Sequence, residues 1–121
     1  MVITTGGNVG IGTTSPGTFR LAVEGKIGAR EVVVTSSSPW PDYVFHKAYK
    51  LLDLNEVEKY INQYKHLPNI PSATEVADNG VELGTLNAKL LEKIEEITLY
   101  LIEIKKENEA LKQRMSVMEK K

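Results

Sequence analysis

The chain has 121 residues, of which 41% are hydrophobic and 26% are charged, and this composition excludes a disordered segment and a membrane-inserted protein. Lysine and arginine number 15 and aspartate and glutamate 16, so the net charge is −1. That balance argues against a nucleic-acid partner, because nucleic-acid binders carry a basic excess. Without cysteine there are no disulfides or thiolate zinc sites, and two histidines leave little for a metal site. We therefore expect a structural or binding protein with no cofactor rather than an enzyme.

The N-terminal part, residues 1–39, is rich in β-type and turn residues and holds seven of the nine glycines. Over residues 19–34 apolar side chains fall mostly on alternate positions, which predicts two short strands separated by a bend at Gly25 and Gly28. The three valines at 32–34 predict a strand that is buried on both faces. Strands this short and glycine-rich cannot form a core alone, so we expect other chains or stacked repeats to cover them.

A glycine-rich run at residues 6–12 invites comparison with phosphate-binding loops. A P-loop needs lysine after its last glycine, but Thr13 follows Gly12. The dinucleotide fingerprint needs glycine where Ser15 stands. We interpret the run as a tight turn between β-elements.

The middle part, residues 40–84, contains signals for two helices. Asp53 and Glu56 fit a capping box ahead of an apolar helical face, and this helix should end near His66, before Pro68.

A second capping box, Ser72 with Glu75, precedes one or two helical turns that should stop at Gly80. Between the two helices, Pro68 and Pro71 hold an extended segment.

Aromatic side chains gather ahead of these helices. Trp40, Tyr43 and Phe45 stand at near-alternate positions of an expected short strand, where such residues usually belong to a core. The alternative is a ligand platform, for which Trp40, Tyr43 and Tyr49 are the candidate receptor contacts.

The C-terminal part, residues 85–121, carries a heptad repeat that begins just before it at Leu83. Hydrophobic residues recur every seven positions at d and are joined by a second set at a, with Asn87 and Asn108 as polar a residues. A helix of about 34 residues would be roughly 50 Å long. We call the predicted interface of this helix the seam: Leu83, Leu90, Ile94, Ile97, Leu101, Ile104, Asn108, Leu111, Met115 and Met118.

Association between copies is the economical way to bury the seam. Isoleucine at both a and d, at Ile94 and Ile97, favours three strands, while an axial Asn108 would fix register. Glu107 and Lys112 form an opposite-sign g-to-e′ pair in a parallel assembly. The interspersed lysines and glutamates are expected to form a solvated face. The alternative is an amphipathic helix that packs on its own domain.

No residue is assigned to catalysis. The serines at 36–38 indicate a linker, and a nucleophile there would need a base such as Lys47 or Lys50. Asp42 has no second carboxylate nearby in the sequence, and His46 and His66 have no partner at helical spacing.

Several motifs in order carry a resemblance to a known family. Residues 8–16 (NVGIGTTSP) and the alternation in 21–29 resemble the repeat that ends the stalk of phage tail fibres and bacterial fibrous adhesins. The segments 40–45 (WPDYVF), 66–72 (HLPNIPS) and 86–96 (LNAKLLEKIEE) are similar to the C-terminal cap of that family. The layout also resembles the endosialidase-type intramolecular chaperones.

The resemblance implies an α+β chain with three parts: a β-rich stalk end at 1–39, a small α+β cap at 40–84, and a helix at 85–121 that forms a parallel trimeric coiled coil. Its expected role is trimerisation and registration of a tail-fibre or adhesin-like protein on a virion or cell surface, at the end of a longer fibre. The partners implied are the chain itself, as a homotrimer, and a surface receptor or glycan.

Two alternatives stay open. Self-cleaving members of the chaperone family are serine autoproteases that cut beside a Ser-Asp pair. This sequence has no such dipeptide, so we expect a cap that is not cleaved. The other alternative is a coiled-coil scaffold of non-viral origin.

Overall fold

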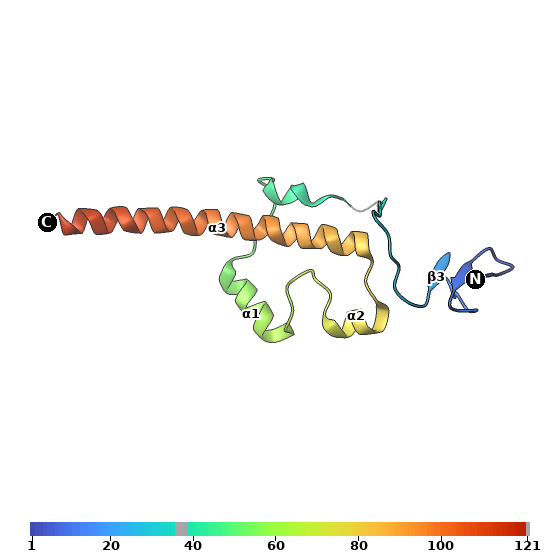
Figure 1. Cartoon of the computed structure of the whole chain (residues 1–121). Coiled ribbons are helices and arrows are strands. Elements are labelled where there is room, and N and C mark those ends of the chain that lie inside the picture. Colours follow the sequence, from blue (N-terminus) through green and yellow to red (C-terminus); the bar gives the residue numbers. More distant parts are fainter. Residues whose placement is uncertain (36–38, 121) are drawn as a thin grey trace. The chain divides into compact units, whose positions relative to one another are not determined.

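The computed structural model describes residues 1–35 and 39–120 (Figure 1). The fold is α+β, as predicted: three short strands are followed by a 3-10 helix, two short helices and one long C-terminal helix. The chain divides into two compact units, Met1–Val33 and Val34–Lys121, which are described one after the other.

The first unit is a three-stranded mixed sheet of β1 (Val2–Ile3), β2 (Val9–Ile11) and β3 (Leu21–Val23). The strand order is β1-β2-β3; β1 pairs antiparallel with β2, and β2 pairs parallel with β3. Gly10 of β2 lies opposite Val2 on one side and Ala22 on the other.

The start of the glycine-rich run forms the tight turn that the sequence predicts, whereas Val9–Ile11 within the run belong to strand β2. Gly7 has a φ of +84°, a conformation that favours glycine, and its N–H donates to the Thr4 carbonyl at 2.9 Å. At Gly10 a Cβ atom would lie only 2.3 Å from the carbonyl oxygen of Thr13, so no side chain fits. The Asn8 amide donates to the Gly17 carbonyl at 3.2 Å, which ties the turn to the loop before β3.

The predicted second strand of this region is wrong for the single chain. Within residues 24–35 the structure has no strand, and Val32 and Val33 are 61% and 83% exposed rather than buried. A strand needs a neighbour for its backbone N–H and C=O groups, and nothing in this part of the chain supplies one.

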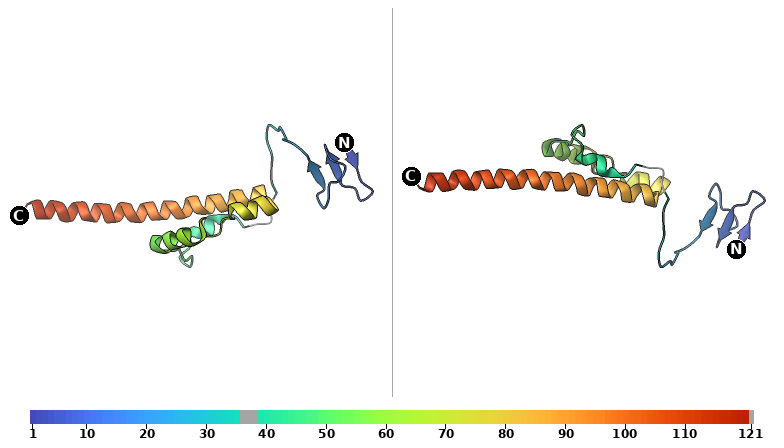
Figure 2. Two further views of the ribbon diagram at one scale, coloured as in Figure 1. Left: turned by 90° about the horizontal axis from the view of Figure 1, so that it is seen from below. Right: turned by 90° about the horizontal axis from the view of Figure 1, so that it is seen from above.

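The second unit begins with a 3-10 helix, η1 (Pro41–Phe45), that lies alongside the N-terminal half of the long helix (Figure 2). The sequence predicts a short strand here, and that prediction is wrong. Pro41 and Val44 are three residues apart, which is one turn of a 3-10 helix, and they are buried side chains. Trp40 and Phe45 are exposed, so they do not belong to a core.

Helix α1 (Leu54–Tyr64) confirms the first predicted helix of the middle part, with one difference at its start. Asp53 caps it by accepting from the Asn55 N–H at 3.0 Å. The expected return bond from Glu56 is absent among the described contacts, since that carboxylate pairs with Lys59 at 3.4 Å. The helix ends at Tyr64 because Lys65 adopts a left-handed conformation with φ 61°.

Helix α2 (Ala73–Asn79) confirms the second prediction in full. The Ser72 hydroxyl accepts from the Glu75 N–H at 3.2 Å, and the Glu75 carboxylate accepts from the Ser72 N–H at 3.4 Å. Gly80 follows the helix with φ 68°, so the expected C-terminal stop is also present.

Helix α3 (Leu83–Glu119) confirms the long C-terminal helix and spans 37 residues, about 55 Å. Within residues 84–100 many side chains are covered, whereas those of 101–119 are all exposed. In Figure 1 the other elements of this unit lie beside the N-terminal half of α3. In the part of the chain that the structure describes, no helix combines the length and apolarity that a membrane crossing requires.

Candidate functional site

The N-terminal half of α3 has one covered face and one bare face. Leu90, Ile94 and Ile97 are 48%, 58% and 52% exposed, although other parts of the unit pack against the same turns. Glu92 and Glu95, on the opposite side, are buried at 4% and 7% exposure. Residues three and four apart share a helix face, so the bare face coincides with the seam and the covered face with positions outside it.

The buried glutamates correct one prediction, that the charged residues of this helix form a solvated face. At Glu92, Glu95 and Glu96 the carboxylates point toward η1 and the segment after it, not into water. The signal that could have found them is their common i, i+3, i+4 spacing opposite the seam, together with hydroxyl-bearing aromatics earlier in the chain.

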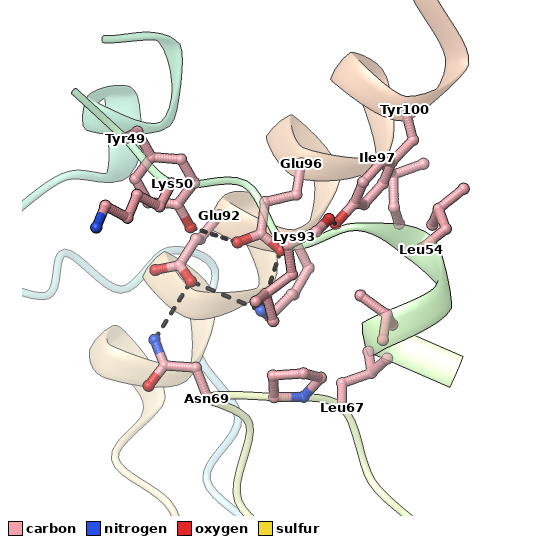
Figure 3. Close-up of a pocket in the computed structure, with 13 residues that line it drawn as sticks. Tyr49, Lys50, Leu54, Leu67, Asn69, Glu92, Lys93, Glu96, Ile97 and Tyr100 are labelled. Carbon is pink, nitrogen blue, oxygen red and sulfur yellow. Dashed lines mark hydrogen bonds and ion pairs between the residues drawn. The ribbon is translucent and has the colours of Figure 1, made fainter. Parts of the chain in front are cut away.

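Tyrosine hydroxyls attach the cap to α3. Tyr43 donates to Glu92 and Tyr49 donates to Glu96 (Figure 3 shows the second bond). Tyr100, on α3 itself, donates in the reverse direction to the Leu52 carbonyl at 2.5 Å. The bonds from Tyr43 and Tyr49 satisfy carboxylates that would otherwise be costly to bury.

The same network includes an amide and a lysine. Asn69 donates to Glu92 at 3.3 Å, and Lys93 lies 3.1 Å from Glu96 and 3.7 Å from Glu92 (Figure 3). Lys93 and the two carboxylates are each less than 15% exposed, so this ion-pair cluster is largely shielded from water.

The phenols of this network hold their protons strongly. The hydrogen bond to Glu92, together with burial and nearby carboxylates, raises the pKa of Tyr43 to about 12. Burial, followed by the hydrogen bond to Glu96, raises the pKa of Tyr49 well above its usual range. Both side chains therefore remain hydrogen-bond donors at neutral pH.

A carboxyl pair forms where η1 meets α3. Burial raises the pKa of Glu95, and the neighbouring Asp42, through its charge and a hydrogen bond, and Glu92 raise it further. The Glu95 Oε2 atom is buried and has no hydrogen-bond partner among the described residues. Asp42 has no second carboxylate nearby in the sequence, but the fold places Glu95 beside it. Neither residue lines the cavity described next, so the pair is not placed for chemistry on a ligand there.

A cavity of about 310 Å³ lies between α3, the start of α1 and the segment around Pro68. Its walls are mostly apolar. Three of its four charged groups, Glu92, Lys93 and Glu96, are paired with one another, and the fourth is Lys50 (Figure 3). Ile97, a seam residue, stands at its edge. The cavity has no Ser, Thr or Cys nucleophile among its described lining residues, and we assign no reaction to it.

The ten seam residues all lie on α3 and are all exposed in the single chain: Leu83, Leu90, Ile94, Ile97, Leu101, Ile104, Asn108, Leu111, Met115 and Met118. They are therefore available for contact with another molecule.

The three candidate receptor contacts are not equivalent. Trp40 is 63% exposed, whereas the hydroxyls of Tyr43 and Tyr49 are committed to α3. The serines at 36–38 lie outside the described residues. Among residues 1–35 and 39–120, no group of histidine and carboxylate side chains is arranged to hold a metal ion. His66 instead has its Nδ1 atom 2.8 Å from the Leu67 carbonyl oxygen.

Comparisons with protein-family models, with curated proteins and with solved structures found no match to this chain.

Proposed function

We propose that this chain is the C-terminal trimerisation and registration domain of a fibrous protein, of the tail-fibre or adhesin type. The seam of α3 joins three copies into a parallel coiled coil. The observation that carries the proposal is the bare seam: the cap covers other faces of α3 and leaves every seam residue exposed.

The exposed area of the chain supports association. The chain exposes 10392 Å², whereas a compact monomer of 13.5 kDa exposes about 6500 Å². Val44 is the sole buried hydrophobic side chain of the part that the structure describes. Burying a half-exposed leucine or isoleucine contributes about 1 kcal/mol, so the nine apolar seam residues offer stabilisation on the order of 10 kcal/mol per chain.

The number and direction of the helices in the coiled coil follow from the residues at the seam and beside it. Ile94 and Ile97 place β-branched side chains at consecutive a and d positions, which favours three strands over two. Asn108 at a costs stability but penalises a shifted register, because its amide would then face apolar neighbours. Glu107 and Lys112 pair between chains only if the helices run parallel.

Trimerisation by α3 serves the β-rich part of the chain. The small sheet leaves Phe19 and Leu21 exposed at 69% and 54%, so it lacks cover of its own. Pairing strands between separate chains has an entropic cost that precedes any gain from contacts. A coiled coil that forms first keeps the three chains together at high effective concentration and in register.

Receptor contact is the second part of the proposal. Trp40 is the most exposed of the three candidate aromatics and, among the described residues, makes no side-chain hydrogen bond that holds the cap on α3. It is the side chain that we assign to contact with a surface receptor or glycan, which commonly stacks on an exposed aromatic ring.

A pair of isoleucine variants tests the trimer. Ile97→Asp places a carboxylate on the axis in every chain and is expected to reduce the mass in solution from three chains to one. Ile102→Asp is the matched control, because Ile102 is 46% exposed on the same helix but lies outside the seam. Equilibrium sedimentation should show a trimer for the control alone. If Ile97→Asp keeps the trimer mass, the seam is wrong.

A further inference from the structure

A groove of about 400 Å³ lies beside the seam, between the start of α1 and the middle of α3. The cap side contributes Leu52, Asp53 and Leu54, and the helix side contributes Tyr100, Glu103 and Ile104. Ile104 is also a seam residue, so the groove is continuous with the surface that joins the copies.

The charges of this groove are of one sign. Asp53, Glu103 and Glu107 line it, and no lysine or arginine does. Within residues 1–35 and 39–120 none of these three carboxylates has an ion-pair partner. Two of them, Asp53 and Glu103, act on Tyr100: burial raises the pKa of its phenol, and Glu96, Asp53 and Glu103 raise it further. A cation would therefore be stabilised here.

The groove combines apolar side chains with carboxylates, which suits a lysine side chain. Leu52 and Leu54 are 47% and 45% exposed, and they stand next to the carboxylates. A lysine has an apolar stem and a charged tip, so it can cover leucine side chains while its ammonium stays among carboxylates.

Coiled-coil geometry identifies the lysine of a neighbouring chain that would lie at the groove. In a parallel coiled coil, a g residue faces the e residue of the next chain, five positions later. Tyr100 is a g residue, so the neighbouring chain presents its Lys105 there. Lys105 of the same chain lies on the opposite flank of the seam and cannot reach the groove. Its intrachain partner is Glu109 at 3.7 Å, an exposed pair that contributes little.

We propose that this groove receives Lys105 of a second copy of the chain, so that the cap of each chain clasps the helix of its neighbour. The inference rests on the proposed function, because it needs a parallel assembly. It adds that the cap takes part in the interface between chains and helps to fix the register of their helices. A shift of one heptad in one direction would bring the uncharged Thr98 to the groove, whereas the opposite shift would bring Lys112, so the groove disfavours the first of these shifts.

Cross-linking tests the clasp, because the chain has no cysteine of its own. The double variant Asp53→Cys with Lys105→Cys is treated with a short bis-maleimide and separated on a denaturing gel. Each chain then carries one thiol for each neighbour, so a covalent trimer is expected. Either single variant can form at most a covalent dimer, which makes the two single variants the controls for the count.

A second pair separates the clasp from the coiled coil. Glu107→Cys with Lys112→Cys links g to e′ without any cap residue, so it reports the parallel assembly alone. If this pair gives a covalent trimer, and neither the Asp53–Lys105 pair nor an Asn55–Lys105 pair does, the clasp is refuted while the proposed function stands. If neither pair links chains and the unmodified protein has the mass of one chain, the proposed function fails and the clasp fails with it.

Asp53 also caps α1, so its replacement could disturb the groove. Asn55→Cys with Lys105→Cys avoids this, because Asn55 lines the same groove and leaves the cap residue in place. The expected product is again a covalent trimer, and its absence from this variant as well overturns the inference.

Discussion

Residues 84–100 of α3 carry a cap along one side, whereas residues 101–119 are exposed on every side. Both halves continue one heptad pattern, yet only in the first half do other parts of the chain cover side chains of the helix. The difference separates two faces of the helix. The cap covers positions outside the seam, and the exposed seam continues through both halves. A helix in water gains most of its stability from packing, so we expect the second half to depend on other copies.

The largest expected effect comes from a change at the seam in the bare half. Leu111→Asp places a carboxylate on the axis of the proposed trimer and should convert that trimer to monomers. In the monomer, amides of 101–119 should lose protection from hydrogen exchange by on the order of 100-fold, while those of 84–100 remain slower because the cap still covers them.

Gln113→Asp is the control for this experiment, since Gln113 lies on the same half at an f position and is exposed. It should retain both the mass of three chains and the protection of 101–119. Equal loss of protection in both halves of Leu111→Asp would contradict the distinction between them.

A smaller effect is expected where the cap is attached. Tyr43→Phe removes the hydroxyl that donates to Glu92 and leaves a buried carboxylate with fewer donors, at a cost of about 1–3 kcal/mol. Exchange of the amides in η1 should accelerate accordingly, while the mass of the assembly stays the same. Tyr64→Phe is the control, because Tyr64 is 52% exposed and its hydroxyl has no partner among the described residues.

Asn108 permits a test of register in the bare half. Asn108→Ile replaces a polar axial residue by an apolar one and should raise the melting temperature by roughly 5–10 °C. The same change should admit other registers or chain numbers, seen as additional masses by native mass spectrometry. An unchanged or lower melting temperature would count against an axial Asn108.

The pH dependence of the covered half gives the smallest effect. Because the pKa of Glu95 is raised by burial, Asp42 and Glu92, the folded state holds this proton more tightly than the unfolded state. Stability should therefore decrease as pH rises from the ordinary value of 4.5 through the raised pKa. Glu95→Gln removes the charge and should flatten this decrease, with a higher urea midpoint at pH 7.

Glu109→Gln is the control for the pH series, since the Glu109 side chain is 62% exposed. Its urea midpoints should follow those of the unmodified chain at each pH. If Glu95→Gln follows them too, the Asp42–Glu95 pair has no bearing on the docking of η1.

Local signals in the sequence predict most of the elements. The Ser72–Glu75 capping box and Gly80 define α2, and the apolar spacing after Asp53 defines α1. The heptad repeat gives α3 and the seam. These features depend on residues within a few positions of one another, so a single sequence contains them.

Contacts between distant segments explain what the sequence does not predict. The 3-10 form of η1 depends on burying Pro41 and Val44 against α3, which no local pattern announces. Glu92 is buried beside Tyr43 and Glu95 is buried beside Asp42, residues of a distant segment, and a charged helix position otherwise indicates solvent. The strand expected at 32–34 is absent because its pairing partner is not in this part of the chain.

Native mass spectrometry of the unmodified chain tests the central claim most directly. The bare seam predicts an assembly of three chains of 13.5 kDa each at micromolar concentration, with no shorter fragment in the spectrum. A single chain as the dominant species would contradict the account, because the ten exposed seam residues would then have no partner.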